Sequence, residues 1–409
     1  MRVGTTLQRN GHKVSVLDYS GKDPKGIKKQ ANDFDLFGFS ATTPQMPYVM
    51  NLHRMLKQAN PKARTVLGGP HASALYHLRK KGVKDINIED AEVFDTIYAG
   101  EGESSELIKM FVPGWQDAGI VKNVDSVVVP DRNMIDLKSY RYKLFDKLTT
   151  SIQTQRGCPH QCIFCSGRDV EMYNRVRMHS PERVLEELDK LHTDFGFSSF
   201  MWYDDEINLN VGRLEKLCNL LVKRPYQHRG FVRSDNIVKY PESVAMMADA
   251  GFVKLCTGVE SGSDRILKLL QKRATKEINT EARRIVKREG VHYEAFLLLG
   301  HPTETLEDVS ETVEWVRQNK PDDFDLNLVT PYPGSKIYDE AVPSKRFADY
   351  SWDFKGLFFN KPRYAEEDSF YKGLDQQSRS NVRTEELDNR AYMNIRDSAD
   401  KYLRGEIKK

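Results

Sequence analysis

Short apolar segments alternate with amphipathic stretches along most of the chain, an order that is typical of parallel β/α proteins. In the first hundred residues, apolar runs that end in Gly, Thr or Pro turn signals predict strands at 13–17, 34–40, 64–68 and 96–99. Residues 1–9 have the pattern of a helix that ends before Gly11, so no strand is predicted ahead of Lys13. A doubly wound domain normally opens with a central strand. We therefore expect a Rossmann-like domain that lacks its first strand, either because the start codon was placed too far downstream or because the domain is reduced.

The alternation resumes with greater regularity from about residue 150. Strands are predicted at 150–155, 200–203, 230–233, 252–258, 293–299 and 324–329. Helix signals lie between them, for example Ser180 as an N-cap before Pro181, and Asn210 before an apolar stripe. Successive β/α units of this kind predict a partial (β/α)6 barrel of the TIM type, whose chemistry lies at the carboxyl ends of the strands.

These patterns divide the chain into four regions. An α/β domain is expected over 1–112, and a linker without a clear period over 113–147. The partial barrel is expected over 148–340, and a mainly helical region, with a helix at about 383–404, over 341–409.

Composition narrows the function classes. The 409 residues are 39% hydrophobic and 30% charged, which excludes collagen-like and wholly disordered proteins. The net charge of +3 gives no electrostatic reason to expect nucleic acid as the main partner. The basic residues between Lys272 and Arg288 are predicted to be a solvated helix face. No apolar run approaches the roughly 20 residues that span a bilayer, so we expect no membrane span and a cytoplasmic protein.

Three of the five cysteines lie within eight residues: Cys158, Cys162 and Cys165, with the spacing C-x3-C-x2-C. An odd count with one tight cluster is a poor disulfide framework and favours metal chemistry in a reducing compartment. Thiolates are the ligands of iron–sulfur clusters, and three thiolates leave one iron of a 4Fe–4S cluster open. The alternative is a structural zinc loop with His160 as an extra ligand, but the usual ligand pairs separated by a longer loop are absent. Cys218 and Cys256 are predicted to be core residues.

The cysteine loop, with the aromatic Phe164 before its last cysteine, resembles that of the radical S-adenosylmethionine (SAM) enzymes. This resemblance implies a 4Fe–4S cluster on the three cysteines and SAM bound at the neighbouring strand ends. Segment 202–206, with Tyr203 and Asp204, is similar to the part of the family's fold that holds the SAM amino group. Glu260 is expected to bind the ribose hydroxyls. Arg233 is expected to pair with the SAM carboxylate, since guanidinium binds carboxylate bidentately.

The N-terminal region resembles the cobalamin-binding domain that precedes the barrel in one large subclass of this family. The resemblance rests on three small-residue loops at predicted strand ends. It implies that the corrin lies against Ser40, Thr42, Gly68, Gly69, His71, Gly100 and Gly102. No Asp-x-His-x-x-Gly motif occurs there, so no histidine is offered as a lower cobalt ligand.

The resemblance implies radical cleavage of SAM, followed by methyl transfer to an unactivated carbon or by oxidative ring formation. A small-molecule substrate and an electron donor such as flavodoxin or ferredoxin are the expected partners. Two alternatives remain at this point: a cobalamin-independent radical SAM oxidoreductase, and a non-catalytic protein that carries a cluster for structure or sensing. The acidic segments near Asp204 and Glu260 favour an enzyme, because a scaffold needs no SAM cleft.

Overall fold

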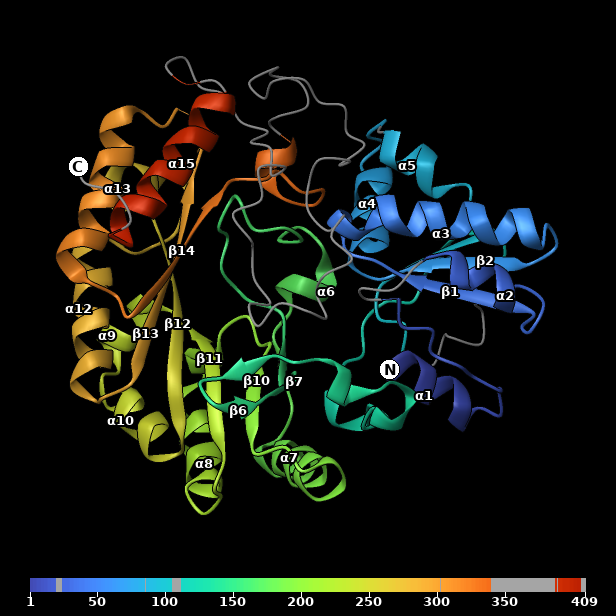
Figure 1. Ribbon diagram of the computed structural model, residues 1–409, viewed down its shortest axis with the longest axis horizontal. Coiled ribbons are helices and arrows are strands. Elements are labelled where there is room, and N and C mark those ends of the chain that lie inside the picture. The colour runs from blue at the N-terminus through green and yellow to red at the C-terminus, as the bar shows by residue number, and fades with distance from the viewer. Residues whose placement is uncertain are drawn as a thin grey trace.

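The computed structural model describes residues 1–19, 24–84, 86–104, 112–301, 303–339, 387 and 389–405. Within these ranges the chain forms two parallel β-sheets, each covered by helices (Figure 1). The chain between 121 and 178 includes two short hairpins, one of which carries the cysteine loop.

The first sheet has the order β1-β2-β3-β4, with every pair parallel. Its strands are β1 (Leu36–Ser40), β2 (Arg64–Gly68), β3 (Thr96–Ala99) and β4 (Gly114–Asp117). Its helices are α1 (Arg2–Arg9), α2 (Ile27–Gln30), α3 (Met46–Ala59), α4 (Pro70–Lys80) and α5 (Ile86–Ala91). Leu75 and Leu78 of α4 pack with Leu67 and Ile97 in one core cluster, while Leu7 of α1 packs with Val66 and Tyr98 in another. Alternate residues of β2 and β3 therefore serve two apolar layers, as in a doubly wound domain.

Two predictions for this domain are wrong. Residues 13–17 form no strand, because a strand needs a hydrogen-bonding neighbour and every pairing of this sheet is made by β1 to β4. The predicted linker 113–147 contains β4, which pairs with β3 from Thr96↔Gly114 to Ala99↔Asp117. The predicted strands at 34–40, 64–68 and 96–99 are confirmed as β1, β2 and β3.

The second sheet has six parallel strands in the order β14-β13-β12-β11-β10-β7. The strands are β7 (Thr150–Ile152), β10 (Ser199–Trp202), β11 (Gln227–Val232), β12 (Phe252–Glu260), β13 (His292–Leu299) and β14 (Asp323–Leu328). Each predicted strand of this region is found within a few residues of its expected position. The strand order is sequential and the sheet is open between β14 and β7, which is the arrangement of a partial barrel.

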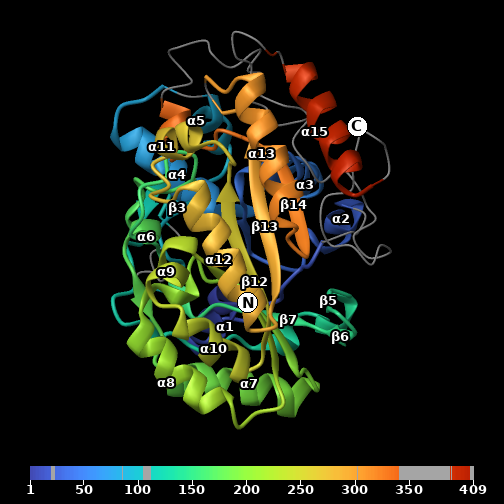
Figure 2. The same ribbon diagram turned by 90° about the vertical axis from the view of Figure 1, so that its left-hand side faces the viewer.

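Helices pack on the outer face of this sheet (Figure 2). They are α7 (Pro181–Phe195), α8 (Val211–Leu221), α9 (Ser234–Lys239), α10 (Glu242–Asp249), α12 (Lys276–Arg288) and α13 (Leu306–Asn319). Helix α11 (Asp264–Leu269) packs instead with Ile163 of the cysteine loop. Ser180 caps α7 as predicted, and Asn210 caps α8; each side chain accepts a hydrogen bond from the backbone N–H three residues on. Tyr293, Ala295, Leu297 and Leu299 of β13 point into this helix-covered core, so the alternate residues face the concave side.

The last described element is α15 (Asn389–Leu403), which contacts β14 and α13. It confirms the later part of the helix predicted at 383–404. The earlier part of the predicted helical region, 341–386, lies outside the described residues. Among the helices that the structure describes, none is long and apolar enough to cross a membrane.

Candidate functional site

The cysteine loop is closed at its base by a two-residue antiparallel ladder. β8 (Gln155–Arg156) pairs with β9 (Arg177–Met178), so Arg156 and Arg177 stand opposite each other at the two ends of the loop. The Cys158 N–H donates to the Tyr173 carbonyl at 2.9 Å. Gly157 has φ +79°, and a Cβ there would lie 2.1 Å from the Arg175 carbonyl oxygen. The glycine before the first cysteine is therefore required by this close approach of the backbone.

The three cysteines form no disulfide; Cys162 is buried, and Cys158 and Cys165 are half-buried. Burial raises the pKa of the Cys165 thiol to about 11, and burial also raises the pKa of Cys158. Buried thiols with raised pKa values remain neutral unless a cation replaces the proton. Three sulfurs within one short loop suit a metal cluster, whose thiol ligands lose their protons on binding.

His160, the extra ligand of the zinc alternative, points to a carboxylate. Its Nε2 atom lies 2.8 Å from Oε2 of Glu206, which is fully buried after β10. Oε1 of Glu206 accepts a hydrogen bond from Asn236 of α9 at 2.6 Å. The ligand atoms of Cys158, His160 and Glu206 lie within 4.8 Å of one another. Glu206 therefore ties the cysteine loop to the ends of β10 and β11, a role that the sequence analysis did not predict.

Two of the residues predicted to bind SAM lie next to the cysteine loop. Nη1 of Arg233, at the end of β11, is 4.0 Å from Sγ of Cys162. Glu260 ends β12 with φ +67° and pairs with Lys272, whose Nζ donates to Oε1 at 2.8 Å. The Arg233 guanidinium also donates to the Lys272 carbonyl at 2.6 Å. Arg233 also donates to both oxygens of Asp235, at 2.9 and 2.8 Å, so the fold gathers two ion pairs beside Cys162.

The prediction that Lys272 belongs to a solvated helix face is wrong, because its side chain is buried against Glu260. Lys272 lies between Gln271 and Arg273, which both have positive φ values, 55° and 57°. These two left-handed residues form a tight turn after α11, and the turn directs the lysine inward.

The other residues predicted near SAM differ in exposure. Asp204 is buried and accepts hydrogen bonds from the Thr154 and Gln155 backbone N–H groups at 2.6 and 2.8 Å, so it braces the strand that leads into the cysteine loop. Tyr203 is 44% exposed, and Phe164 packs at the edge of a small apolar cluster with Ile163. Their contacts with SAM stay predictions.

The concave face of the second sheet holds a buried charged layer. Arg229 of β11 donates to Glu294 of β13 at 2.8 Å, and Lys254 of β12 lies 3.2 Å from the same carboxylate. The Cys256 thiol donates to Glu294 at 2.9 Å. Cys256 and Cys218 are both buried, which confirms that they are core residues.

The loops predicted to contact cobalamin follow β1, β2 and β3, and therefore meet at the carboxyl edge of the first sheet. His71 of α4 is buried, and its Nδ1 lies 2.9 Å from the Thr43 hydroxyl. Gly69 has φ +91°, and a Cβ there would lie 2.8 Å from Ser40 Oγ. The Gly100 N–H donates to Ser73 at 3.0 Å. The structure brings these residues together. Contact of the corrin with these residues stays a prediction, as does its contact with Thr42, Gly68 and Gly102.

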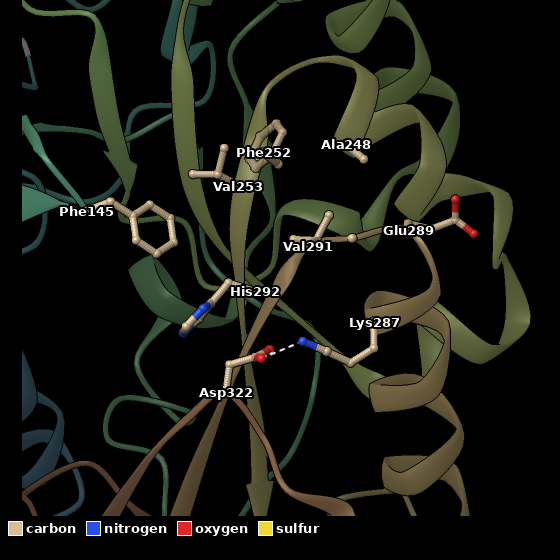
Figure 3. Close-up of a pocket in the computed structure, with 10 residues that line it drawn as sticks. Phe145, Ala248, Phe252, Val253, Lys287, Glu289, Val291, His292 and Asp322 are labelled. Carbon is tan, nitrogen blue, oxygen red and sulfur yellow. Dashed lines mark hydrogen bonds and ion pairs between the residues drawn. The ribbon is translucent and has the colours of Figure 1, made fainter.

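A pocket of about 400 Å³ lies at the other end of the second sheet, by the first residues of β12 and β13 (Figure 3). Phe145, between β5 (Lys143–Leu144) and β6 (Lys147–Leu148), faces His292 across it, and Lys287 pairs with Asp322 at 2.5 Å. The pocket lies at the amino ends of these strands, whereas the chemistry of β/α barrels lies at the carboxyl ends. We therefore treat the pocket as separate from the site at the cysteine loop.

Comparison with known proteins agrees with both parts of the fold. The radical SAM superfamily model matches residues 152–316, and the B12 binding domain model matches residues 2–97. An uncharacterised methyltransferase of Pyrococcus horikoshii is 27% identical over 375 residues, which cover 85% of this chain and 79% of that protein. The anaerobic magnesium-protoporphyrin IX monomethyl ester cyclase of Cereibacter sphaeroides is 24% identical over 82% of this chain, and the match spans 58% of its own length.

Among solved structures, the radical SAM methyltransferase TsrM of Kitasatospora setae, with cobalamin and a 4Fe–4S cluster bound, superposes with a TM-score of 0.61. It is 16% identical, and the match covers 83% of this chain and 70% of that chain. At this identity the likeness concerns the fold.

Proposed function

This chain belongs to the radical SAM superfamily, in the subclass that carries a B12-binding domain, and on that premise we propose that it transfers a methyl group to an unactivated carbon of a small molecule. Its cofactors are the 4Fe–4S cluster, SAM and cobalamin. The observation that carries the proposal is the position of the cysteine loop, which contacts Arg233 at the end of β11 on one side and the loop after β3 on the other.

When bound, the cluster and SAM would supply the radical chemistry that removes a hydrogen atom from the substrate, and cobalamin would supply the methyl group. The chain's own residues hold and orient these groups. Cys158, Cys162 and Cys165 ligate iron, and Arg233 and Glu260 orient SAM through its carboxylate and ribose. The loops after β1, β2 and β3 hold the corrin, and the buried layer of Arg229 and Glu294 closes the concave side below the site.

The reaction needs an external electron donor, for which a flavodoxin or a ferredoxin has suitable chemistry.

We assign the domain limits as in the sequence analysis, except that β4 joins the first domain.

Oxidative ring formation is a second candidate. The observation that favours it is that magnesium-protoporphyrin cyclases from three organisms match 77–87% of this chain. Because the match spans 58% and 60% of the length of two of these relatives, their whole activity is not carried over to this chain. Labelled SAM separates the two reactions, since only methyl transfer places the SAM methyl carbon in the product.

The proposal is tested with anaerobically reconstituted protein. We expect the wild type to bind about four irons per chain and, with dithionite, to convert SAM into 5′-deoxyadenosine. Cys162→Ala should lose both the cluster and the cleavage, because it removes one of three ligands. Cys218→Ala is the matched control, since Cys218 is a buried thiol outside the loop.

A fully loaded wild type that forms no 5′-deoxyadenosine would contradict the enzyme proposal. Cleavage without any bound hydroxocobalamin after gel filtration would favour the cobalamin-independent oxidoreductase.

A further inference from the structure

A buried group of four charged side chains joins the first domain to the base of the cysteine loop. We call Glu101, Glu103, Arg156 and Arg177 the interdomain clamp. Oε1 of Glu101 lies 3.0 Å from Nη1 of Arg156, and Oε2 lies 2.7 Å from Nη1 of Arg177. Arg156 also pairs with Glu103 through its other terminal nitrogen.

The two arginines are cross-strand partners. Arg156 of β8 stands opposite Arg177 of β9, and residues 157–176 between them include all three cysteines of the loop. The two oxygens of the single Glu101 carboxylate therefore bridge both ends of the cysteine loop. Only Gly157 separates Arg156 from Cys158, so a shift of the arginine backbone moves the first iron ligand directly.

The clamp is well shielded from water. Glu101 is 4% exposed, Arg156 7% and Arg177 9%. Two carboxylates face two guanidinium groups, so the charges balance. Burial of ion pairs is costly and adds little net stability compared with apolar packing, but it imposes a definite geometry on the groups that it joins. A buried group of ion pairs that fixes geometry more than it adds stability suits residues that position a neighbouring loop.

The Glu101 carboxylate is itself fixed by the backbone of the first domain. Glu101 follows Gly100, which has φ +90° and lies so near the next segment that a Cβ would be 2.4 Å from the Gly119 carbonyl oxygen. The Glu101 N–H donates to that carbonyl at 3.0 Å, and Oε2 accepts from the Val121 N–H at 2.6 Å. The loop that carries both glutamates is thus the loop after β3, at the predicted corrin edge.

We propose that Glu101 and Glu103 are positioning residues, which hold the cysteine loop against the carboxyl edge of the first sheet and couple ligand binding at that edge to metal binding by the cysteines. The inference rests on the proposed function, because it takes the cysteines as iron ligands. Coupling of this kind is reciprocal: a ligand that orders the loop after β3 also orders the cysteine loop, and the reverse.

Hydrogen–deuterium exchange of the full chain tests the clamp without any turnover. In the metal-free protein, Glu101→Gln keeps the shape of the side chain but removes the charge that bridges the two arginines. We expect the amides of residues 157–176 to exchange about tenfold faster than in the wild type, since their closure depends on this contact. Glu101→Asp keeps the charge and should restore much of the protection.

Glu171→Gln is the matched control. Glu171 lies in the same cysteine loop and pairs with Arg175, but both side chains are about 60% exposed. We expect no change in exchange from this variant, since exposed pairs contribute little. Should Glu101→Gln fail to fold, Glu103→Gln carries the test, because it leaves both Glu101 contacts in place and weakens only the pairing at Arg156.

Hydroxocobalamin tests the coupling. Its addition to the metal-free wild type should slow exchange in 157–176, and the same addition to Glu101→Gln should slow exchange only in the first domain. Equal protection of the cysteine loop in both proteins would overturn the inference, as would unchanged exchange in Glu101→Gln. Failure of the wild type to bind iron on reconstitution would instead overturn the proposed function, so the two failures are distinguishable.

Discussion

At the scale of single residues, Glu304, between β13 and α13, is a carboxyl group whose pKa is strongly raised. One of its oxygens accepts from the Gly300 N–H at 2.5 Å, and the other is buried with no hydrogen-bond partner among the residues that the structure describes. Burial raises the pKa of Glu304 to about 8, with a smaller contribution from Asp308. The folded protein therefore carries this carboxyl in its neutral form at pH 7.

This shift predicts a pH dependence of stability. The unfolded chain releases the Glu304 proton above about pH 4.5, whereas the folded chain holds it to about pH 8. The unfolded state binds fewer protons in that window, so the free energy of unfolding falls as the pH rises from 4.5 to 8 and then levels off. Glu304→Gln should remove this decline and stabilise the protein above pH 8, by on the order of 1.4 kcal/mol per unit of pKa shift.

Urea denaturation of both proteins at pH 5 to 9 measures the difference. Glu307→Gln is the control, because Glu307 lies three residues on and is exposed. Stability curves of wild type and Glu304→Gln that stay parallel across this range would contradict the prediction.

The role of a residue could be predicted where it depends on the spacing of nearby residues in the sequence. It could not be predicted where it depends on a partner far away in the sequence. The three cysteines could be identified as metal ligands from their C-x3-C-x2-C spacing. Glu206 meets His160 across 46 positions, and Glu101 meets Arg177 across 76. Lys272 depends on positive φ at two non-glycine neighbours, which no local pattern reveals.

At the scale of elements, the strands of the second sheet were predictable because each carries apolar residues in a short segment between two stretches with helical periodicity. The pattern at 13–17 failed because strand formation also requires a neighbour, which a local pattern does not report. β4 was missed for the opposite reason: its four residues, Gly114–Asp117, are exposed or half-buried and carry no apolar run, yet they pair with β3.

The connection between β2 and α4 leads to a prediction about the corrin edge. A Cβ on Gly69 would press on Ser40 Oγ at 2.8 Å and on the Ala41 backbone at 3.0 Å, and the positive φ adds strain. Gly69→Ala should therefore displace the loop after β1 and weaken hydroxocobalamin binding by about tenfold or more, equivalent to about 1.4 kcal/mol. Equilibrium dialysis measures this affinity.

Gly82→Ala is the matched control for this experiment. Gly82 also has a positive φ, +72°, but its Cβ would meet nothing within 4 Å. Both alanine variants therefore carry the strain of a positive φ, but only Gly69→Ala crowds neighbouring atoms. Equal affinities for hydroxocobalamin in Gly69→Ala and Gly82→Ala would show that the loop after β1 takes no part in binding.

At the scale of the whole molecule, the two sheets are joined by an apolar contact as well as by the interdomain clamp. Tyr338 follows the last strand of the second sheet, yet it is 1% exposed and packs in the core of the first domain with Leu75, Leu78 and Ile97. Lys81, just after α4, pairs with Asp169 of the cysteine loop and with Asp339. We infer that the two sheets unfold as one cooperative unit.

Tyr338→Ala tests this unit. Loss of a fully buried aromatic side chain costs about 3–5 kcal/mol, and here the cost falls on the contact between the domains. Calorimetry should show a single transition for the wild type and two separated transitions for Tyr338→Ala. Phe145→Ala is the control, because Phe145 is 56% exposed at the far end of the second sheet and its loss should leave one transition. A single, merely lowered transition in Tyr338→Ala would mean that the charged contacts alone suffice to join the domains.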